Sequence, residues 1–186
     1  MNKILKNEVQ WEGEFLRCSI ITYMDRKGVV RQWESVDRVN VSGIVVIVPI
    51  TVNYEVVLIK QYRPPLNSMV IECPAGLCKD GEELIHCAAR ELFEETGYGK
   101  GEFNLLDSGP IAVGSSSAIL TLYLARGLRK ISVPRGDENE DIEVFTVTLT
   151  DIYKTLKLLR AEGYYVDLKL YGFIELAKQH LNIKLR

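Results

Sequence analysis

The stretch that decides the fold reads Gly76-Leu-Cys-Lys-Asp-Gly-Glu82 and continues, after seven residues, as Arg90-Glu91-Leu92-Phe93-Glu94-Glu95-Thr96-Gly97-Tyr98. Written as a pattern it is G-x5-E-x7-R-E-U-x-E-E-x-G-U, in which U is an apolar residue. Asp80 is followed three residues later by Glu83, a capping-box pattern that predicts the start of a helix near Gly81. Gly97 predicts the end of this helix, because glycine adopts the left-handed conformation at little cost.

Three glutamates share one patch of the predicted helix. Glu91, Glu94 and Glu95 stand at positions i, i+3 and i+4, so they lie side by side on the helix surface. Their charges repel, and carboxylate oxygens are the ligands that Mg2+ or Mn2+ prefers, so a metal ion is expected among them. Clustered glutamates are often only a solvated face, and Arg90 could pair with one of them for structure alone. The glycines, Arg90 and Glu82 at fixed spacing favour the metal site.

The segments around this stretch alternate between strand-like and helix-like patterns. Strands are expected at 15–23, 29–39, 44–50, 55–61, 69–72, 103–106, 119–126 and 143–148. Apolar residues at every third or fourth position predict helices at 151–162 and 167–181. Strands with interspersed helices predict the α/β class, with the glutamate-bearing helix packed on a mixed sheet.

The pattern from Gly76 to Tyr98 resembles the Nudix box, the metal-binding loop-helix-loop of enzymes that hydrolyse nucleoside diphosphates linked to another group. Tyr98 is its only mild departure, because a smaller aliphatic side chain is usual there. Four further segments look like the ADP-ribose (ADP-sugar) pyrophosphatase branch: Thr22-Tyr-Met-Asp25, Trp33-Glu-Ser-Val36, Gln61-Tyr-Arg-Pro-Pro65 and Glu72-Cys-Pro-Ala-Gly76. The resemblance runs from Phe15 to the C-terminal helix and is weaker after Tyr98.

This resemblance implies a Nudix-type α/β/α sandwich with a mixed sheet, preceded by an N-terminal antiparallel β-hairpin region. Residues 1–42 would form the N-terminal β-strand region, used for dimerisation and for contact with the nucleotide base. Residues 43–186 would form the Nudix hydrolase domain. In this branch the N-terminal strands cross over to a second subunit, so the resemblance also implies a homodimer.

The same resemblance implies the catalytic machinery. The Mg2+ or Mn2+ ions would be held by the carboxylates of Glu91, Glu94 and Glu95, and by the backbone carbonyl of Ala75. Such ions lower the pKa of the attacking water, and a carboxylate then takes its proton, which makes Glu91 and Glu95 part of catalysis. The base would come from the acidic loop 137–143, where alignment favours Glu140 and leaves Glu138 as the alternative. The expected products are AMP and ribose 5-phosphate.

Substrate contacts are implied at five further positions. Arg38 and Arg63 would hold the diphosphate, since an arginine fork makes charge-assisted bonds that both attract and orient phosphate oxygens. Trp33 would stack on adenine, with Phe15 on the other side where the family often has a second tryptophan. Glu34 would contact the edge of the base.

One segment departs from the family pattern, at residues 109–118. The branch usually has a proline-glycine turn and then an acidic residue there, whereas this chain reads Gly109-Pro-Ile-Ala-Val-Gly-Ser-Ser-Ser-Ala118 and has no acid. Recognition of the terminal ribose is therefore expected to differ, so that another sugar could be accepted. Two alternatives stay open: a Nudix hydrolase of GDP-mannose or an oxidised nucleotide, and a non-catalytic nucleotide sensor.

Bulk properties narrow the class further. The chain has 186 residues, a formal net charge of −2 and an apolar fraction of 47%, which predicts one main domain with a substantial core. The near-balanced charge argues against nucleic acid as a partner. The longest apolar run, 44–52, is too short to cross a bilayer, and the charged N-terminus is unlike a secretion signal. We therefore expect a cytoplasmic protein with no membrane partner.

The cysteines are expected to play no part in chemistry. Cys18, Cys73, Cys78 and Cys87 include no C-x-x-C pair, and the chain has only two histidines, so a zinc site is not predicted. In a reducing cytosol the four cysteines are interpreted as small apolar residues.

Overall fold

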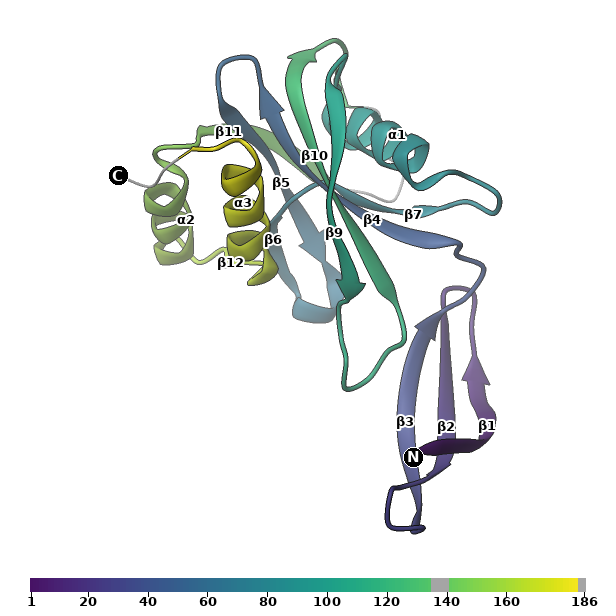
Figure 1. Cartoon of the computed structure of the whole chain (residues 1–186). Helices are drawn as coiled ribbons and strands as arrows, with labels where there is room; N and C mark the ends of the chain where they lie inside the picture. The colour runs from purple at the N-terminus through teal and green to yellow at the C-terminus, as the bar shows by residue number, and fades with distance from the viewer. Residues whose placement is uncertain (135–140, 184–186) are drawn as a thin grey trace.

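The computed structural model describes residues 1–134 and 141–183 as two β-sheets and three α-helices (Figure 1). The N-terminal sheet contains β1 (Lys3–Glu12), β2 (Leu16–Met24) and β3 (Val30–Arg38), paired antiparallel in this order. It extends away from the rest of the molecule. The predicted N-terminal hairpin is confirmed as β2 and β3, and β1 is an additional strand that the sequence analysis missed.

The second sheet has nine strands with mixed pairing. At its centre β4 (Gly43–Thr51) runs parallel to β10 (Ile119–Lys130), while β7 (Ala75–Cys78) and β9 (Glu102–Pro110) pair antiparallel with β4 and β10. The remaining strands are β5 (Glu55–Arg63), β6 (Ser68–Glu72), β8 (Tyr98–Gly99), β11 (Ile142–Thr148) and β12 (Tyr165–Val166). A short 3-10 helix, η1 (Pro64–Leu66), joins β5 to β6.

Helices cover both faces of this sheet, with α1 (Leu84–Thr96) on one side and α2 (Ile152–Ala161) and α3 (Lys169–His180) on the other (Figure 1). Alternation along β4 builds both interfaces, because successive side chains of a strand point to opposite faces. Val45 and Ile47 pack with α1, whereas Val46 and Val48 pack with α2 and α3. The predicted α/β/α sandwich is confirmed. None of the helices in the described residues is long and apolar enough to cross a membrane.

Helix α1, which carries the three glutamates, begins later than predicted. Its first residue is Leu84, its N-cap is Glu83, and no side chain caps it, so the capping role predicted for Asp80 is wrong. The preceding turn is closed by Glu82 instead, whose carboxylate accepts the Lys79 backbone N–H at 2.9 Å. The predicted end is confirmed: Gly97 has a φ of 72°, and its N–H donates to the Phe93 carbonyl.

Two cysteines form a disulfide, which corrects the interpretation of all four as simple apolar residues. Cys78, the last residue of β7, is bonded to Cys87 in α1, with their Cα atoms 5.4 Å apart. Such a separation suits a disulfide, and the turn between β7 and α1 produces it. The spacing of the two residues along the chain does not reveal that proximity. Cys18 and Cys73 are free.

Candidate active site

A cleft of about 880 Å³ lies between α1, η1, α3 and the near end of the N-terminal sheet. It gathers predicted metal-binding and substrate-binding residues from distant parts of the chain: Phe15, Arg38, Arg63, Ala75, Glu91, Glu94 and Glu95. The structure therefore brings most of the predicted site into one place.

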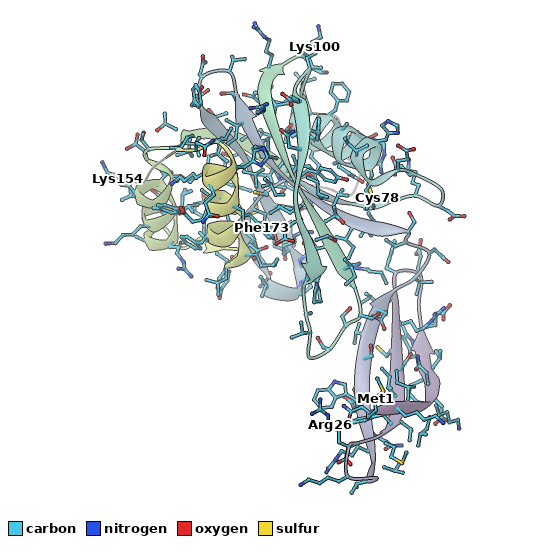
Figure 2. All side chains as sticks on the ribbon, viewed as in Figure 1. Met1, Arg26, Cys78, Lys100, Lys154 and Phe173 are labelled. Carbon is cyan, nitrogen blue, oxygen red and sulfur yellow. A yellow bond between two sulfur atoms is a disulfide. The ribbon has the colours of Figure 1, made fainter. Side chains whose placement is uncertain are left out.

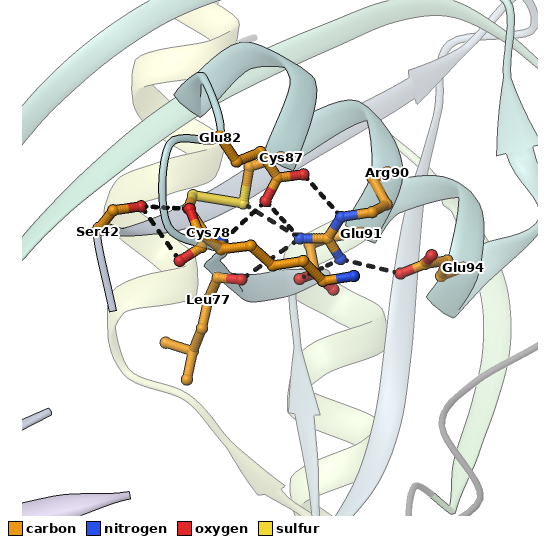
Figure 3. Close-up of a disulfide and its surroundings, with 9 residues drawn as sticks. Ser42, Leu77, Cys78, Glu82, Cys87, Arg90, Glu91 and Glu94 are labelled. Atoms are coloured by element: carbon orange, nitrogen blue, oxygen red, sulfur yellow. Dashed lines mark hydrogen bonds and ion pairs between the residues drawn. A yellow bond between two sulfur atoms is a disulfide. The ribbon is translucent and has the colours of Figure 1, made fainter. Parts of the chain in front are cut away.

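Arg90 organises the carboxylates on the α1 side of the cleft (Figure 3). Its Nε and Nη2 donate to the two carboxylate oxygens of Glu82, each at 2.8 Å. Its Nη1 donates to Glu91 at 2.8 Å and to Glu94 at 3.0 Å. The hydrogen bond from Arg90 holds the pKa of Glu82 at about 2, because it favours the ionised carboxylate. Arg90 thus offsets part of the repulsion among these acids.

The backbone of β7 lies against the carboxylates of Glu91 and Glu95. It passes so close to α1 that a Cβ atom at Gly76 would overlap with the Glu91 carboxyl group, which explains the glycine. The Ala75 N–H donates to Glu95 Oε2 at 3.1 Å. Glu95 is buried, with 3% of its surface exposed, so its position is set by the protein rather than by solvent.

The donor set of the cleft suits a hard divalent cation. Glu91, Glu94 and Glu95 all line it, and carboxylate oxygens are the side-chain ligands that Mg2+ prefers. Glu95 already accepts a backbone hydrogen bond, which is the kind of outer support that orients a metal ligand. These residues therefore fit a divalent metal ion.

A second group of side chains of the kinds that ligate metals does not form such a site. Within residues 1–134 and 141–183, Cys78, Glu82 and Cys87 are the one group whose ligand atoms all lie within 4.8 Å of one another. Its two sulfur atoms are bonded to each other, and the Glu82 carboxylate is paired with Arg90. The group serves to brace the turn before α1.

Arg63 ends β5 at the edge of the cleft. Pro64 follows it and opens η1, and Asn67 closes η1 with a φ of 46° before β6 begins. The Arg63 Nε and Nη2 donate to Glu72 Oε2 at 2.9 and 2.7 Å. Glu72 therefore orients the guanidinium, while Nη1 stays outside this pair.

Arg38 and Phe15 lie together at the end of the N-terminal sheet nearest the cleft. Arg38 pairs with Leu16 across β3 and β2, and the Val39 N–H donates to the Phe15 carbonyl at 3.1 Å. Both side chains line the cleft although they belong to the other sheet.

Residues 41–167 match the model of the NUDIX domain family. The chain belongs to this family. It is similar to an ADP-sugar pyrophosphatase of Mus musculus, with 33% identity over 97% of this chain and 89% of that protein. It is also similar to an ADP-ribose pyrophosphatase of Bacillus subtilis (strain 168), with 34% identity over 76% of this chain and 73% of that protein. The crystal structure of an ADP compounds hydrolase matches with a TM-score of 0.77 at 23% identity, covering 97% of this chain and 94% of that chain.

Two predicted residues do not line the Nudix cleft of the single chain, and two more lie outside the residues that the structure describes. Trp33 and Glu34 lie on β3 outside the residues that line it, and the Trp33 Nε1 donates to the Gly114 carbonyl at 2.8 Å. Glu138 and Glu140 lie outside the described residues. The roles given to these four residues stay predictions.

Helix α3 adds a wall to the Nudix cleft that the sequence analysis missed. Asp167, Lys169 and Phe173 line it, and Figure 2 labels Phe173 on this helix. The Asp167 carboxylate accepts bonds from the backbone N and the Nζ of Lys169, at 3.0 and 2.8 Å. Helical periodicity predicted α3 itself, but periodicity does not tell which residues of its first turn meet a cleft formed by distant strands.

Proposed function

We propose that the protein hydrolyses the diphosphate bond of ADP-ribose or a related ADP-sugar and releases AMP and a sugar phosphate. The observation that carries this proposal is one cleft lined both by the carboxylates of α1 and by Arg38 and Arg63. Carboxylates that hold divalent cations and arginines that hold phosphates are what a metal-dependent diphosphate hydrolase requires. The similarity to an ADP-sugar and an ADP-ribose pyrophosphatase supports the choice of nucleotide.

The arginines are assigned to the diphosphate. Arg63 is held by Glu72 through Nε and Nη2, which fixes its plane and leaves Nη1 to donate into the cleft. Arg38 enters from the N-terminal sheet and lines the same cleft. Two guanidinium groups from different sheets can hold the diphosphate from two directions, which orients as well as binds it.

Glu91, Glu94 and Glu95, with the Ala75 carbonyl, would hold Mg2+ or Mn2+. When bound, such an ion neutralises phosphate oxygens and makes a bound water more acidic. The contribution of the chain is to keep the ligand oxygens in place. The Ala75 N–H orients Glu95, and Arg90 orients Glu91 and Glu94.

The general base is proposed to be Glu140, with Glu138 as the alternative. Its support is the position of Glu140 in the acidic segment before β11. Glu140→Gln should lower kcat far more than it raises KM, because a base acts in the transition state. Glu138→Gln is the matched variant. An unchanged rate in the first together with a loss in the second would transfer the role to Glu138.

The homodimer predicted from the resemblance is proposed to form through the N-terminal sheet. This sheet exposes many large apolar side chains, among them Ile4, Leu5, Val9, Trp11, Val30 and Trp33. An apolar surface of this kind is typical of one covered by another protein, and a second copy would bring Trp33 and Glu34 toward its partner's cleft. Light scattering should give twice the chain mass of 21.1 kDa, and a mass of one chain would reject the dimer.

The predicted cytoplasmic location has a consequence for the disulfide. Cytoplasmic thiols are kept reduced, so Cys78 and Cys87 should be thiols in the cell and close their bond only under oxidising conditions. Alkylation of thiols in freshly lysed cells, followed by mass measurement, checks this. A Cys78–Cys87 disulfide that is intact at lysis, and therefore not alkylated, would argue against the cytoplasm.

The first experiment measures nucleotide release from ADP-ribose, ADP-glucose, NADH and GDP-mannose, with Mg2+ and with EDTA. Metal-dependent AMP release, fastest from ADP-ribose or another ADP-sugar, is the expected result. Faster metal-dependent release of GMP from GDP-mannose would keep the Nudix chemistry and replace the proposed substrate. No cleavage of any compound by folded protein would favour the non-catalytic sensor.

A further inference from the structure

The tip of the β9–β10 hairpin docks on the N-terminal sheet (Figure 1). We call residues 111–118 the serine loop, because three successive serines lie in it. The Val36 N–H of β3 donates to the Ser115 carbonyl at 2.7 Å, and the Trp33 Nε1 donates to the Gly114 carbonyl at 2.8 Å. The serine loop thus follows the edge of β3 that is not paired with β2.

The strongest part of this contact is the carboxylate of Asp37. Its Oδ1 accepts the backbone N–H and the hydroxyl of Ser117, both at 2.8 Å, and the hydroxyl of Ser116 at 3.2 Å. Its Oδ2 accepts the hydroxyl of Ser35 at 2.8 Å. Burial raises the pKa of Asp37, but the hydrogen bonds from these serines outweigh burial and lower it. A fully hydrogen-bonded carboxylate of this kind is held in one position.

Asp37 lies directly beside the part of the sheet that enters the cleft. The next residue is Arg38, which lines the cleft and pairs with Leu16, and the Val39 N–H holds the Phe15 carbonyl. A further link to the body is the short segment after β3, in which the Ser42 hydroxyl donates to the carbonyls of Cys78 and Lys79. A rotation of the sheet about that segment would move Arg38 and Phe15 relative to the glutamates.

We propose that Asp37 and Ser117 are positioning residues that hold Arg38 and Phe15 over the cleft and thereby set its affinity for the nucleoside diphosphate. Neither residue lines the cleft. The serine loop connects β9 to β10, and both strands are part of the same sheet as β4. Fixing β3 to this loop therefore fixes Arg38 relative to the box. Small displacements of a binding group are costly, because a charge-assisted bond to phosphate depends on alignment.

This proposal rests on the proposed function and gives the unusual loop sequence a purpose. Where the family pattern has an acid after a proline-glycine turn, this chain has serines, and those serines bind the acid of β3. The loop therefore serves to dock the N-terminal sheet within one chain.

The test compares kinetic constants for Asp37→Ala and Ser117→Ala with two matched variants. Ser115→Ala keeps the backbone carbonyl that Val36 uses, and Ser117→Thr keeps the hydroxyl that Asp37 accepts. We expect KM for ADP-ribose to rise about tenfold, ~1.4 kcal/mol, in the first two, with kcat within about twofold of wild type. Ser115→Ala and Ser117→Thr should behave like wild type. Unchanged KM in folded Asp37→Ala and Ser117→Ala would overturn the proposal.

A second test measures whether the effects of Asp37→Ala and Arg38→Ala on KM are coupled. In an Arg38→Ala background, Asp37→Ala should add a smaller increase in KM than it does in wild type, because only Phe15 is left for it to position. An undiminished increase would show that Asp37 does not act through Arg38 and would overturn that assignment.

Trp33 fluorescence tests the docking of the serine loop without relying on enzymatic activity. The chain has two tryptophans, so Trp11→Phe leaves Trp33, whose indole is bonded to the serine loop, as the reporter. Its fluorescence emission should shift in Asp37→Ala and Ser117→Ala but not in Ser115→Ala. If wild-type protein cleaves no compound, calorimetric binding of ADP to the same variants decides. Weaker ADP binding alongside the shift supports positioning, and unchanged ADP binding rejects it.

Discussion

The Nudix box and the N-terminal sheet both supply residues to the cleft, but the contacts that hold them differ in range. In the box, Arg90 bonds Glu82, Glu91 and Glu94, and the disulfide joins residues separated by nine positions. The N-terminal sheet is docked by contacts such as Asp37 with Ser117, which are 80 positions apart. The box is thus stabilised by contacts within a short stretch of the chain, whereas the N-terminal sheet depends on the serine loop, which is distant in sequence.

This difference suggests that the box and the N-terminal sheet have separate tasks, one in turnover and one in substrate binding. The box carries the proposed metal ligands, and damage to it should appear in the rate of turnover or in the stability of the fold. The docked sheet presents Arg38 and Phe15, and damage to its docking should appear mainly as weaker binding. The following variants test whether this division is real.

Glu95→Gln should produce the largest effect. An amide keeps an acceptor for the Ala75 N–H but loses the negative charge that the proposed metal ligand supplies. We expect kcat to fall by roughly 10³-fold, more than the loss of an outer-shell partner usually costs, with little change in the unfolding midpoint. Glu83→Gln, at the exposed N-cap of the same helix, is the control. Near-normal turnover in Glu95→Gln would break the assignment of the box as the chemical centre.

Removing the disulfide should produce the next largest effect, on stability. Cys78→Ala combined with Cys87→Ala frees a loop of nine-residue separation, which costs about 2–3 kcal/mol in the chain-entropy description. Urea unfolding under non-reducing conditions measures this, with Cys18→Ala as the control. Thiol titration of unfolded oxidised protein should find two thiols, Cys18 and Cys73, and four reactive thiols would contradict the bond.

Arg90→Ala should destabilise the protein somewhat less. It leaves partly buried carboxylates of Glu82 and Glu91 without their guanidinium, a loss of about 2 kcal/mol, or a fall in Tm of about 4–8 °C. Arg126→Ala breaks an exposed ion pair with Glu102 and should leave Tm unchanged. Equal Tm values for the two variants would show that the box is not specially braced.

The pH dependence of stability should show the smallest effect. Glu82 has a pKa of about 2 in the fold, below its ordinary 4.5, so it contributes stability above pH 4.5 that is lost as the pH falls toward 2. Glu82→Gln removes this contribution and should flatten the acid side of the stability profile measured by urea unfolding. Glu83→Gln should keep the wild-type profile. Identical profiles for all three proteins would mean that Arg90 does not hold Glu82 in its ionised form.

Local spacing was enough to predict that three glutamates of the box lie together on one helix. Glu91, Glu94 and Glu95 share a face because a helix repeats every 3.6 residues, and this holds whatever the rest of the chain does. Gly97 was predicted as the helix end for a similarly local reason, and its φ of 72° confirms it. The start of the helix was misplaced because the Lys79–Glu82 turn competes with a cap at Asp80, a choice that local patterns do not resolve.

The sequence by itself determined the family through the box motif, and the resemblance to that family implied the sandwich fold. Helical periodicity placed the three carboxylates together on α1, because such a repeat acts within a short window. Only the tertiary structure decided that Cys78 meets Cys87, that Asp37 binds Ser117, and that α3 closes one side of the cleft. These contacts depend on where strands and loops are placed in space, and no local repeat encodes the distance between residues that the fold brings together.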